Sequence, residues 1–187
     1  MSTSAGQPEF ETTLKNLQAA FNGESNAHAK YAAFARRADE EGYGQVASLF
    51  RAASRAEHIH AVNHAAVIRK LGATPEAKIE QHAVSSTREN LKAAIAGEEY
   101  ERDVMYPAFI QAAEAQKQSA AVRTFQHALE AEKEHARMYA EALAALEEKK
   151  PKTSYYVCSV CGYTAERLSF DRCPVCHHPK EKFEMVN

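Results

Sequence analysis

The most constraining feature of this sequence is a set of acidic and histidine residues on helix faces that ought to form an apolar core. Apolar residues recur at spacings of three and four through 14–38, 46–71, 91–112 and 122–146, which predicts four helices. The inner faces of these helices also carry Glu24, Glu57, His60, Glu98, Glu101, Glu132 and His135. Burying a lone carboxylate costs several kcal/mol even after the protein relaxes, so we expect cations to neutralise this cluster.

The four predicted helices are two copies of one hairpin, since residues 16–24 match residues 90–98 at six of nine positions. Each copy supplies one Glu on its first helix and a Glu-x-x-His pair on its second. Residues three apart share a helix face, so two facing hairpins offer four carboxylates and two imidazoles to one space. This is the donor set of di-iron and di-manganese helix bundles, and the absence of a thiolate argues against zinc or Cu(I).

The repeat also predicts roles within this donor set. Glu57 and Glu132 each share a helix with a histidine, which makes them the natural bridges between two metals. Glu24 and Glu98 are then terminal ligands, one on each metal. These assignments, with His60 and His135 as the imidazole ligands, complete a site of six residues.

Glu101 breaks the repeat, because its counterpart in the first copy is Ala27. It follows Glu98 by three residues and so lies on the same face, either as a seventh ligand or as a carboxylate beside the site. Tyr31 and Tyr106 lie one to two turns beyond the first-helix glutamates, near enough to hydrogen-bond a ligand carboxylate. An ordinary core position is the alternative for both tyrosines.

The connections between the predicted helices are unequal in length. The turns inside each hairpin are short, whereas the segment 72–85 is too long for a tight turn and predicts a crossover of the ferritin-like type. Ser86-x-x-Glu89 predicts a capping box at the start of the third helix. Pro107 predicts a kink or an interruption of hydrogen bonding within that helix. We interpret His64 as a core histidine.

The composition changes once, at 149–154. The chain before this point is rich in Ala, Glu and Leu, and the chain after it is rich in Tyr, Val, Cys and Pro without a helical period. We therefore predict a helical domain at 1–148, a linker at 149–154 and a small module at 155–187. About 33 residues do not bury a sufficient core without a covalent or metal staple.

The predicted staple is a metal ion held by all four cysteines of the chain, which form two C-x-x-C pairs at Cys158, Cys161, Cys173 and Cys176. In a chain without an export signal this spacing indicates a metal site over disulfides. Four thiolates in a tetrahedron suit iron or zinc, and the spacing alone does not decide between them.

The overall charge and hydropathy exclude several other classes of protein. A net charge of −2 over 187 residues is too weak to indicate nucleic-acid binding. No apolar run approaches the roughly 18 residues needed to span a membrane. The polar stretch Met1–Glu11 lacks the apolar segment of a signal peptide. We therefore expect a cytoplasmic protein that binds neither nucleic acid nor membrane.

Together these motifs resemble the rubrerythrin family, in which a ferritin-like di-iron bundle precedes a rubredoxin-like Fe(Cys)₄ module. The resemblance extends from about Leu14 to Val186, and it is carried by Gly23 with Glu24, Glu57-x-x-His60, Glu98-x-x-Glu101, Met105-Tyr106-Pro107, Glu132-x-x-His135 and the two C-x-x-C pairs. One departure is His177, which stands where rubredoxin-type knuckles usually have glycine. A turn with positive φ strains a histidine, although less than most residues.

The resemblance implies a fold, a set of cofactors and an activity. The expected fold is an all-α four-helix bundle with a long crossover, followed by a small rubredoxin-like β/knuckle metal module. The expected cofactors are two irons in the bundle and one iron in the module, where zinc can replace it in purified protein. The activity implied is reduction of hydrogen peroxide to water in oxidative stress defence, because two adjacent ferrous ions can give peroxide both electrons without releasing hydroxyl radical.

The resemblance also implies partners and a movement at the site. In the family, the residues that match Glu101 and His60 exchange on one iron as the redox state changes. The module would return electrons from a separate NAD(P)H-dependent reductase, since this chain has no nucleotide-binding motif. A homodimer or a higher homo-oligomer is expected.

Two other interpretations remain at this point. A ferroxidase or iron-handling protein fits the ferritin-like bundle but needs no module that returns electrons. A non-catalytic protein, with a zinc ribbon that binds other proteins, is the third. A red Fe(Cys)₄ chromophore in the purified protein favours the peroxidase, and a colourless module favours the zinc ribbon.

Overall fold

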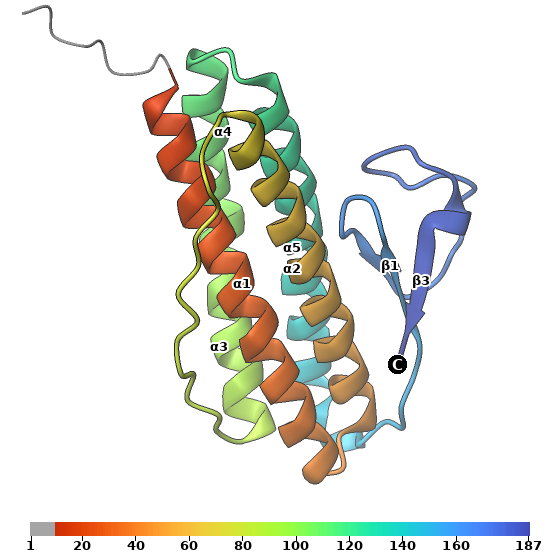
Figure 1. Cartoon of the computed structure of the whole chain (residues 1–187). Coiled ribbons are helices and arrows are strands. Elements are labelled where there is room, and N and C mark those ends of the chain that lie inside the picture. Colours follow the sequence, from red (N-terminus) through yellow and green to blue (C-terminus); the bar gives the residue numbers. More distant parts are fainter. Residues whose placement is uncertain (1–9) are drawn as a thin grey trace, which may run out of the picture.

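The computed structural model describes residues 10–187, so the first nine residues of the predicted helical domain lie outside the described range. Helices α1 to α5 form a bundle of four members (Figure 1), with the bounds α1 (Glu11–Glu40), α2 (Gly44–Lys70), α3 (Thr87–Tyr100), α4 (Tyr106–Ala115) and α5 (Ser119–Ala144). A π-helical turn, η1 (Glu101–Met105), joins α3 to α4 without a break, so these three elements make one member. The predicted four-helix bundle is confirmed. Within the described range, no helix combines the length and the apolar character needed to cross a membrane.

The third member of the bundle is interrupted where Pro107 predicts it. Proline has no backbone N–H to complete the α-helical hydrogen bond, and the π turn η1 ends one residue before Tyr106–Pro107. A π turn takes one more residue than an α turn. The helix therefore continues in the same direction but with its face shifted by one residue in the sequence.

The long connection 73–86 runs alongside α1 in an extended form (Figure 1). Side-chain amides of α1 bond to its backbone: Asn22 Oδ1 accepts from Lys78 N at 2.8 Å, and Asn26 Oδ1 accepts from Glu80 N at 2.8 Å. Four residues of a helix rise about 6 Å, and two residues of extended chain span about 6.6 Å. Every fourth residue of α1 therefore meets every second residue of the crossover.

The start of α3 has the serine half of the predicted capping box, while the carboxylate of Glu89 accepts from Lys92 Nζ at 2.9 Å. Ser86 has an extended backbone at the N-cap position, and its hydroxyl oxygen accepts from the backbone N–H of Glu89 at 3.3 Å. This contact satisfies one of the free N–H groups of the first turn. The crossover therefore ends at a defined residue.

The apolar core of the bundle consists of two clusters. One is built around four aromatic rings, those of Tyr31, Phe34, Phe50 and Tyr139. The other includes Leu17, Val67, Tyr106 and Phe125. On α1 and α5 the predicted metal ligands fall between residues of one cluster and residues of the other, and on α2 Glu57 and His60 lie at the end of the first cluster, so a polar layer crosses the middle of the bundle.

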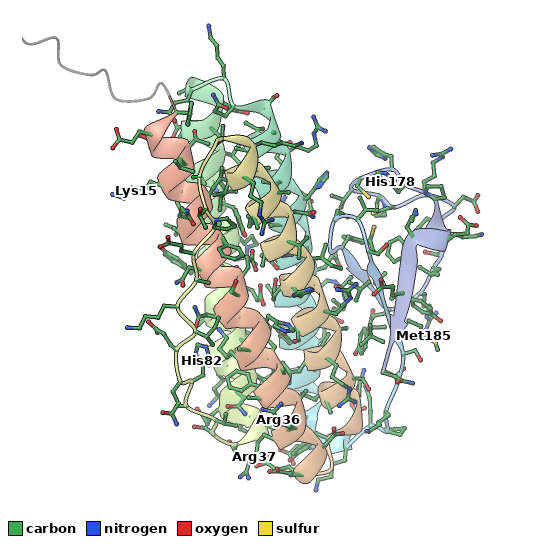
Figure 2. The ribbon with its side chains drawn as sticks, in the orientation of Figure 1. Lys15, Arg36, Arg37, His82, His178 and Met185 are labelled. Carbon is green, nitrogen blue, oxygen red and sulfur yellow. The ribbon has the colours of Figure 1, made fainter. Side chains whose placement is uncertain are left out.

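The C-terminal module is a three-stranded antiparallel sheet in the order β2-β1-β3, with β1 (Tyr155–Cys158), β2 (Thr164–Ala165) and β3 (Phe183–Val186). Two short 3₁₀ turns, η2 (Leu146–Glu148) and η3 (Lys180–Lys182), precede β1 and β3. The predicted small module with cysteine knuckles is confirmed. Met185 on β3 lies on the side of the module that faces away from the bundle, and His178 lies at the tip of the module (Figure 2).

The module lies against the bundle beside α2 and α5 (Figure 1). Arg55 on α2 donates two hydrogen bonds to the carboxylate of Glu184 on β3, at 2.8 and 3.0 Å. Asn63, two turns further along α2, donates to the backbone oxygen of Val160 at 2.9 Å. The first cysteine knuckle is thus held over the middle of the bundle, at the level of the polar layer.

Candidate metal centres

Six buried side chains from four helices meet in the polar layer, and each is at most 1% exposed. They form two groups whose ligand atoms lie within 4.8 Å of one another. The first group is Glu24, Glu57, His60 and Glu132, and the second is Glu57, Glu98, Glu132 and His135. Glu57 and Glu132 belong to both groups, which is the arrangement expected of carboxylates shared by two cations.

The two Glu-x-x-His pairs face each other across this layer. His60 Nδ1 lies 2.9 Å from Glu57 Oε2 and 3.1 Å from Glu132 Oε1. His135 Nδ1 lies 2.8 Å from Glu132 Oε2 and 3.5 Å from Glu57 Oε1. Each histidine therefore presents the same ring nitrogen to the glutamate of its own helix and to that of the opposite hairpin.

Most of the lone pairs in this layer have no proton donor. Within the described residues, the atoms without a hydrogen-bond partner include Glu24 Oε2, Glu57 Oε1, Glu98 Oε2, both oxygens of Glu132 and Nδ1 of His135. Polar atoms buried without a partner are costly, and cations supply what protons do not. The residues present therefore fit a pair of metal ions bound by carboxylate and imidazole.

The ionisation of these groups reflects the same shortage of positive charge. Burial, and then the charge of Glu132, raise the pKa of Glu57 to about 8. Burial and Glu132 likewise raise the pKa of Glu98 to about 7. Burial acts to raise the pKa of Glu24 as well, but the neighbouring His60 lowers it below its usual range. Without metal, the cluster therefore keeps protons that free carboxylates would release.

Two tyrosines hold the outer glutamates in a crossed pattern. Tyr31 on α1 donates a hydrogen bond to Glu98 Oε1 at 2.6 Å, and Tyr106 on α4 donates to Glu24 Oε1. Each tyrosine thus donates its hydrogen bond to a glutamate of the other hairpin. Tyr106 follows Glu98 by eight residues whereas Tyr31 follows Glu24 by seven, and the π turn accommodates the additional residue. Both tyrosines lie beside a predicted ligand carboxylate.

His64 is fully buried and has a partner at each ring nitrogen, as the core interpretation predicts. Its Nε2 lies 3.2 Å from the hydroxyl of Tyr106 and its Nδ1 lies 3.0 Å from Thr124 Oγ1. Burial lowers the pKa of His64, which favours a neutral ring. In the second repeat Tyr139 takes this place, and its hydroxyl has no hydrogen-bond partner among residues 10–187. The two halves of the site are therefore chemically different.

Glu101, the first residue of the π turn, belongs to neither four-residue group found in the described chain. Its side chain is only partly buried. Burial, and then the charges of Glu24 and Glu98, raise its pKa well above the usual range. Glu101 is therefore close enough for the charges of the cluster to shift its pKa, although its oxygens lie outside the two groups of ligand atoms.

The four cysteines come together in the module. Cys158 Sγ lies 3.6 Å from Cys176 Sγ, and Cys161 Sγ lies 3.6 Å from Cys173 Sγ, with all four thiols free. A tetrahedron with metal–sulfur bonds of about 2.3 Å has edges of about 3.8 Å, so the thiols are spaced for one metal ion.

The second knuckle contains the departure noted in the sequence. His177 has a φ of 59°, and its backbone N–H donates to Cys173 O at 3.0 Å. The turn therefore adopts the left-handed conformation that favours glycine, and the histidine is accommodated there.

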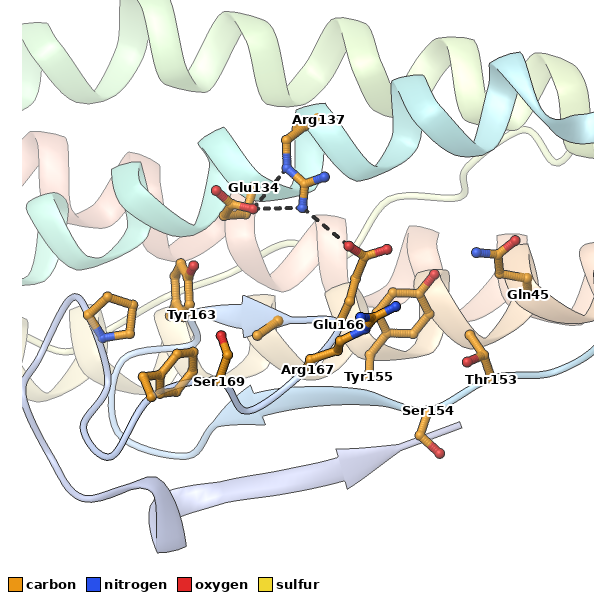
Figure 3. Close-up of a pocket in the computed structure, with 13 residues that line it drawn as sticks. Gln45, Glu134, Arg137, Thr153, Ser154, Tyr155, Tyr163, Glu166, Arg167 and Ser169 are labelled. Carbon is orange, nitrogen blue, oxygen red and sulfur yellow. Dashed lines mark hydrogen bonds and ion pairs between the residues drawn. The ribbon is translucent and has the colours of Figure 1, made fainter.

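A separate cavity of about 750 Å³ lies along the seam between the module and α5 (Figure 3). Arg137 on α5 lies at its edge and pairs with Glu134 at 2.9 Å and with Glu166 of the module at 3.6 Å. None of the six clustered side chains lines this cavity. The cavity is therefore separate from the predicted metal site, and its walls come from the module and from the bundle.

Comparison with known proteins identifies the family. Residues 15–143 match the sequence model described as rubrerythrin, and residues 156–184 match the model of the rubredoxin-like domain of rubrerythrin. The chain belongs to the rubrerythrin family. Nigerythrin of Nitratidesulfovibrio vulgaris is 39% identical over 173 residues, which are 92% of this chain and 85% of that protein. Rubrerythrin-2 of Clostridium acetobutylicum is 36% identical over 176 residues, which are 92% of this chain and 95% of that protein.

Solved structures support the same relationship. Fully reduced, all-ferrous nigerythrin superimposes with a TM-score of 0.86 at 38% identity, covering 98% of this chain and 89% of that one. A bacterioferritin of Mycobacterium tuberculosis superimposes with a TM-score of 0.67 at 21% identity, covering 78% and 90%, and this likeness concerns the fold alone.

The comparisons also settle the nature of the two centres. The bundle carries the carboxylate–histidine di-iron site of the family, and the module carries its four-cysteine rubredoxin-like site. The resemblance read from the motifs is confirmed, and so is the predicted pair of iron centres. Rubrerythrins are oxidoreductases, so this chain belongs to a family of oxidoreductases.

Proposed function

We propose that this protein reduces hydrogen peroxide to water, with electrons supplied by a separate NAD(P)H-dependent reductase and relayed through the four-cysteine module. The observation that carries the proposal is the place of the first cysteine knuckle. Thr164, two residues beyond Gly162 of that knuckle, lies 3.0 Å from Nε2 of His135. A metal centre that only stored iron would need no electron relay in contact with a ligand.

We assign the ligands from the two overlapping groups. Glu57 and Glu132, the shared members, are proposed as bridges, and Glu24 and Glu98 as terminal ligands with His60 and His135. Glu101 is proposed as the seventh ligand, recruited when the charge of the metal pair rises. Its partial burial and its place in the π turn leave it room to move.

The chain's own residues prepare this site for two-electron chemistry. The iron pair, when bound, supplies the electrons that break the O–O bond. Tyr31 and Tyr106 each bond one oxygen of a terminal carboxylate, and the second oxygen of Glu24 and of Glu98, which has no hydrogen-bond partner among the described residues, would be free to hold a metal. The apolar clusters on both sides exclude bulk water, which strengthens these electrostatic contacts. Reduction of peroxide to two waters also consumes two protons, which must reach the site from solvent.

The proposal extends to the cellular setting implied by the family. We propose a cytoplasmic homodimer or higher homo-oligomer that acts in defence against oxidative stress. The supporting fact is the family membership, together with the fold shared with nigerythrin.

A comparison of one turnover with many turnovers tests the function. Chemically reduced wild-type protein should consume peroxide at once, and with a suitable reductase and NADH it should continue. With its bundle saturated with ferrous iron, Cys158→Ser should keep the single reaction, because the bundle ligands are intact, but should lose the NADH-linked turnover. Turnover of this variant at the wild-type rate would show that electrons bypass the module. Oxidation by oxygen as fast as by peroxide would favour the ferroxidase alternative.

A further inference from the structure

The hydroxyl of Thr164 connects the two metal centres. Thr164 lies on β2 and is fully buried. Its Oγ1 lies 3.2 Å from the backbone oxygen of Gly162 and 3.0 Å from Nε2 of His135. A carbonyl oxygen only accepts, so the threonine must donate its single proton to Gly162. The threonine oxygen must then accept from an N–H at Nε2 of His135.

This contact determines which nitrogen of His135 is free. With the proton on Nε2, the lone pair is on Nδ1, and Nδ1 faces Glu132 and Glu57 at 2.8 and 3.5 Å. A metal ligand must present a lone pair, and the partner of the other ring nitrogen fixes both the tautomer and the ring orientation. Thr164 therefore prepares His135 as a ligand from outside the bundle.

The same knuckle also covers the second imidazole. A Cβ placed on Gly162 would overlap the ring of His60, and Gly162 has a φ of +82°. Only glycine allows the backbone to approach the ring this closely in this conformation. His60 thus has Nδ1 turned to Glu57 at 2.9 Å and its opposite edge packed on the knuckle. Both histidines of the di-iron site lie under residues 162–164.

The position of this knuckle depends on its own metal. Cys158 and Cys161 bracket the turn, in which the N–H of Gly162 donates to Cys158 O at 2.8 Å. A module of this size gains much of its folding free energy from the metal that its thiolates bind. Metal in the module therefore orders the loop that carries Thr164.

We propose that Thr164 is a positioning residue for the di-iron site, and that through it metal binding in the four-cysteine module raises the affinity of the bundle for its own metals. The coupling must be reciprocal, so a loaded bundle also tightens metal binding in the module by the same factor. This inference needs both metal sites but not the peroxidase activity, so it can fail or hold independently of the proposed function.

Cobalt binding measures the effect directly. The module of the full-length protein is first filled with zinc, and the bundle is then titrated with Co²⁺ by visible absorption. Thr164→Val keeps the shape and removes the hydroxyl, whereas Thr164→Ser keeps the hydroxyl. Partners that orient a metal ligand are typically worth 10- to 100-fold in affinity. We expect Thr164→Val to weaken Co²⁺ binding about tenfold or more, and we expect Thr164→Ser and the exposed-site control Thr153→Val to match the wild type.

A second comparison separates this role from general damage to the module. The double variant Cys158→Ser/Cys173→Ser removes two of the four thiolates, so that its bundle should bind Co²⁺ more weakly than the wild type. In that background Thr164→Val should have no further effect, because the loop is already released. Wild-type affinity in Thr164→Val, weak binding in Thr164→Ser, or a full additional loss in the cysteine-variant background would each overturn the proposal.

Discussion

Removal of the metals should reverse the usual pH dependence of stability in this protein. Six ionisable groups remain buried together when the ions are stripped, and the cluster compensates by retaining protons. The pKa of Glu57 is about 8 and that of Glu98 is about 7 in the folded chain, against 4.5 for a free glutamate, because of burial and the charge of Glu132. A group with a raised pKa stabilises the fold below its unfolded pKa, and this contribution is lost as the pH rises toward the folded value.

The size of the effect follows from the number of protons retained. Between pH 4.5 and about 7, the folded metal-free chain holds protons on Glu57, Glu98 and Glu101 that the unfolded chain has released. Each such proton lowers the free energy of unfolding by about 1.4 kcal/mol per pH unit, so one to three protons give roughly 1 to 4 kcal/mol per unit. The pKa of Glu24 is lowered, so its contribution is lost only below pH 4.5, outside this window.

Urea unfolding followed by far-ultraviolet circular dichroism checks this prediction, because the signal reports the helices. Metal-free protein should become less stable as the pH rises through the window, whereas metal-loaded protein should not, since binding releases protons and strengthens with pH. Glu57→Gln cannot titrate, so its metal-free slope should be shallower by about one proton. A metal-free slope that is flat or positive would refute the reasoning.

Other substitutions probe single contacts. Tyr106→Phe should destabilise the metal-free bundle by about 1–3 kcal/mol in urea unfolding, because it leaves Glu24 and His64 with one partner fewer. Gly44→Ala should loosen the linker and expose it to limited proteolysis, since the added Cβ would come within 2.6 Å of the linker backbone. Gly23→Ala is its matched control, with open space around the added carbon, and should raise stability by about 0.5–1 kcal/mol. Elemental analysis of fully loaded protein should find three metals per chain, and a single metal would contradict the two-metal site in the bundle.

The ligand cluster could be predicted from the sequence because the sequence itself shows glutamates at positions where burial is unfavourable. A glutamate on an apolar stripe conflicts with burial, and the repeat shows the same conflict at Glu24 and Glu98 and again at Glu57 and Glu132. The structure brings all four together. Helix periodicity was sufficient here because the ligands of each helix are three residues apart or fewer, well within the accuracy of the pattern.

Contacts that depend on register or on docking could not be predicted in this way. The crossed pairing of Tyr106 with Glu24 requires the additional residue of the π turn, which no periodicity reveals. The role of Thr164 requires the module to be seated on the bundle. The amide contacts of α1 with the crossover had a signal, since Gln18, Asn22 and Asn26 are spaced by four, but a polar helix face is more often simply solvated.

Glu101 provides the final test, because neither the repeat nor the two ligand groups require it. Ala27 at the equivalent place shows that the scaffold accepts alanine, so Glu101→Ala should still bind two ferrous ions with His60 retained. Its carboxylate has a pKa raised by burial and by Glu24, and removing it should therefore stabilise the metal-free bundle in urea. A diferric pair carries two more positive charges and gains most from another carboxylate, so peroxide turnover should fall and oxidation by oxygen should become slow and ferritin-like. Peroxide and oxygen kinetics, beside crystals of the variant in both redox states, measure this. Unchanged peroxide kinetics would make Glu101 a bystander, and the peroxidase proposal would then depend on the cysteine module alone.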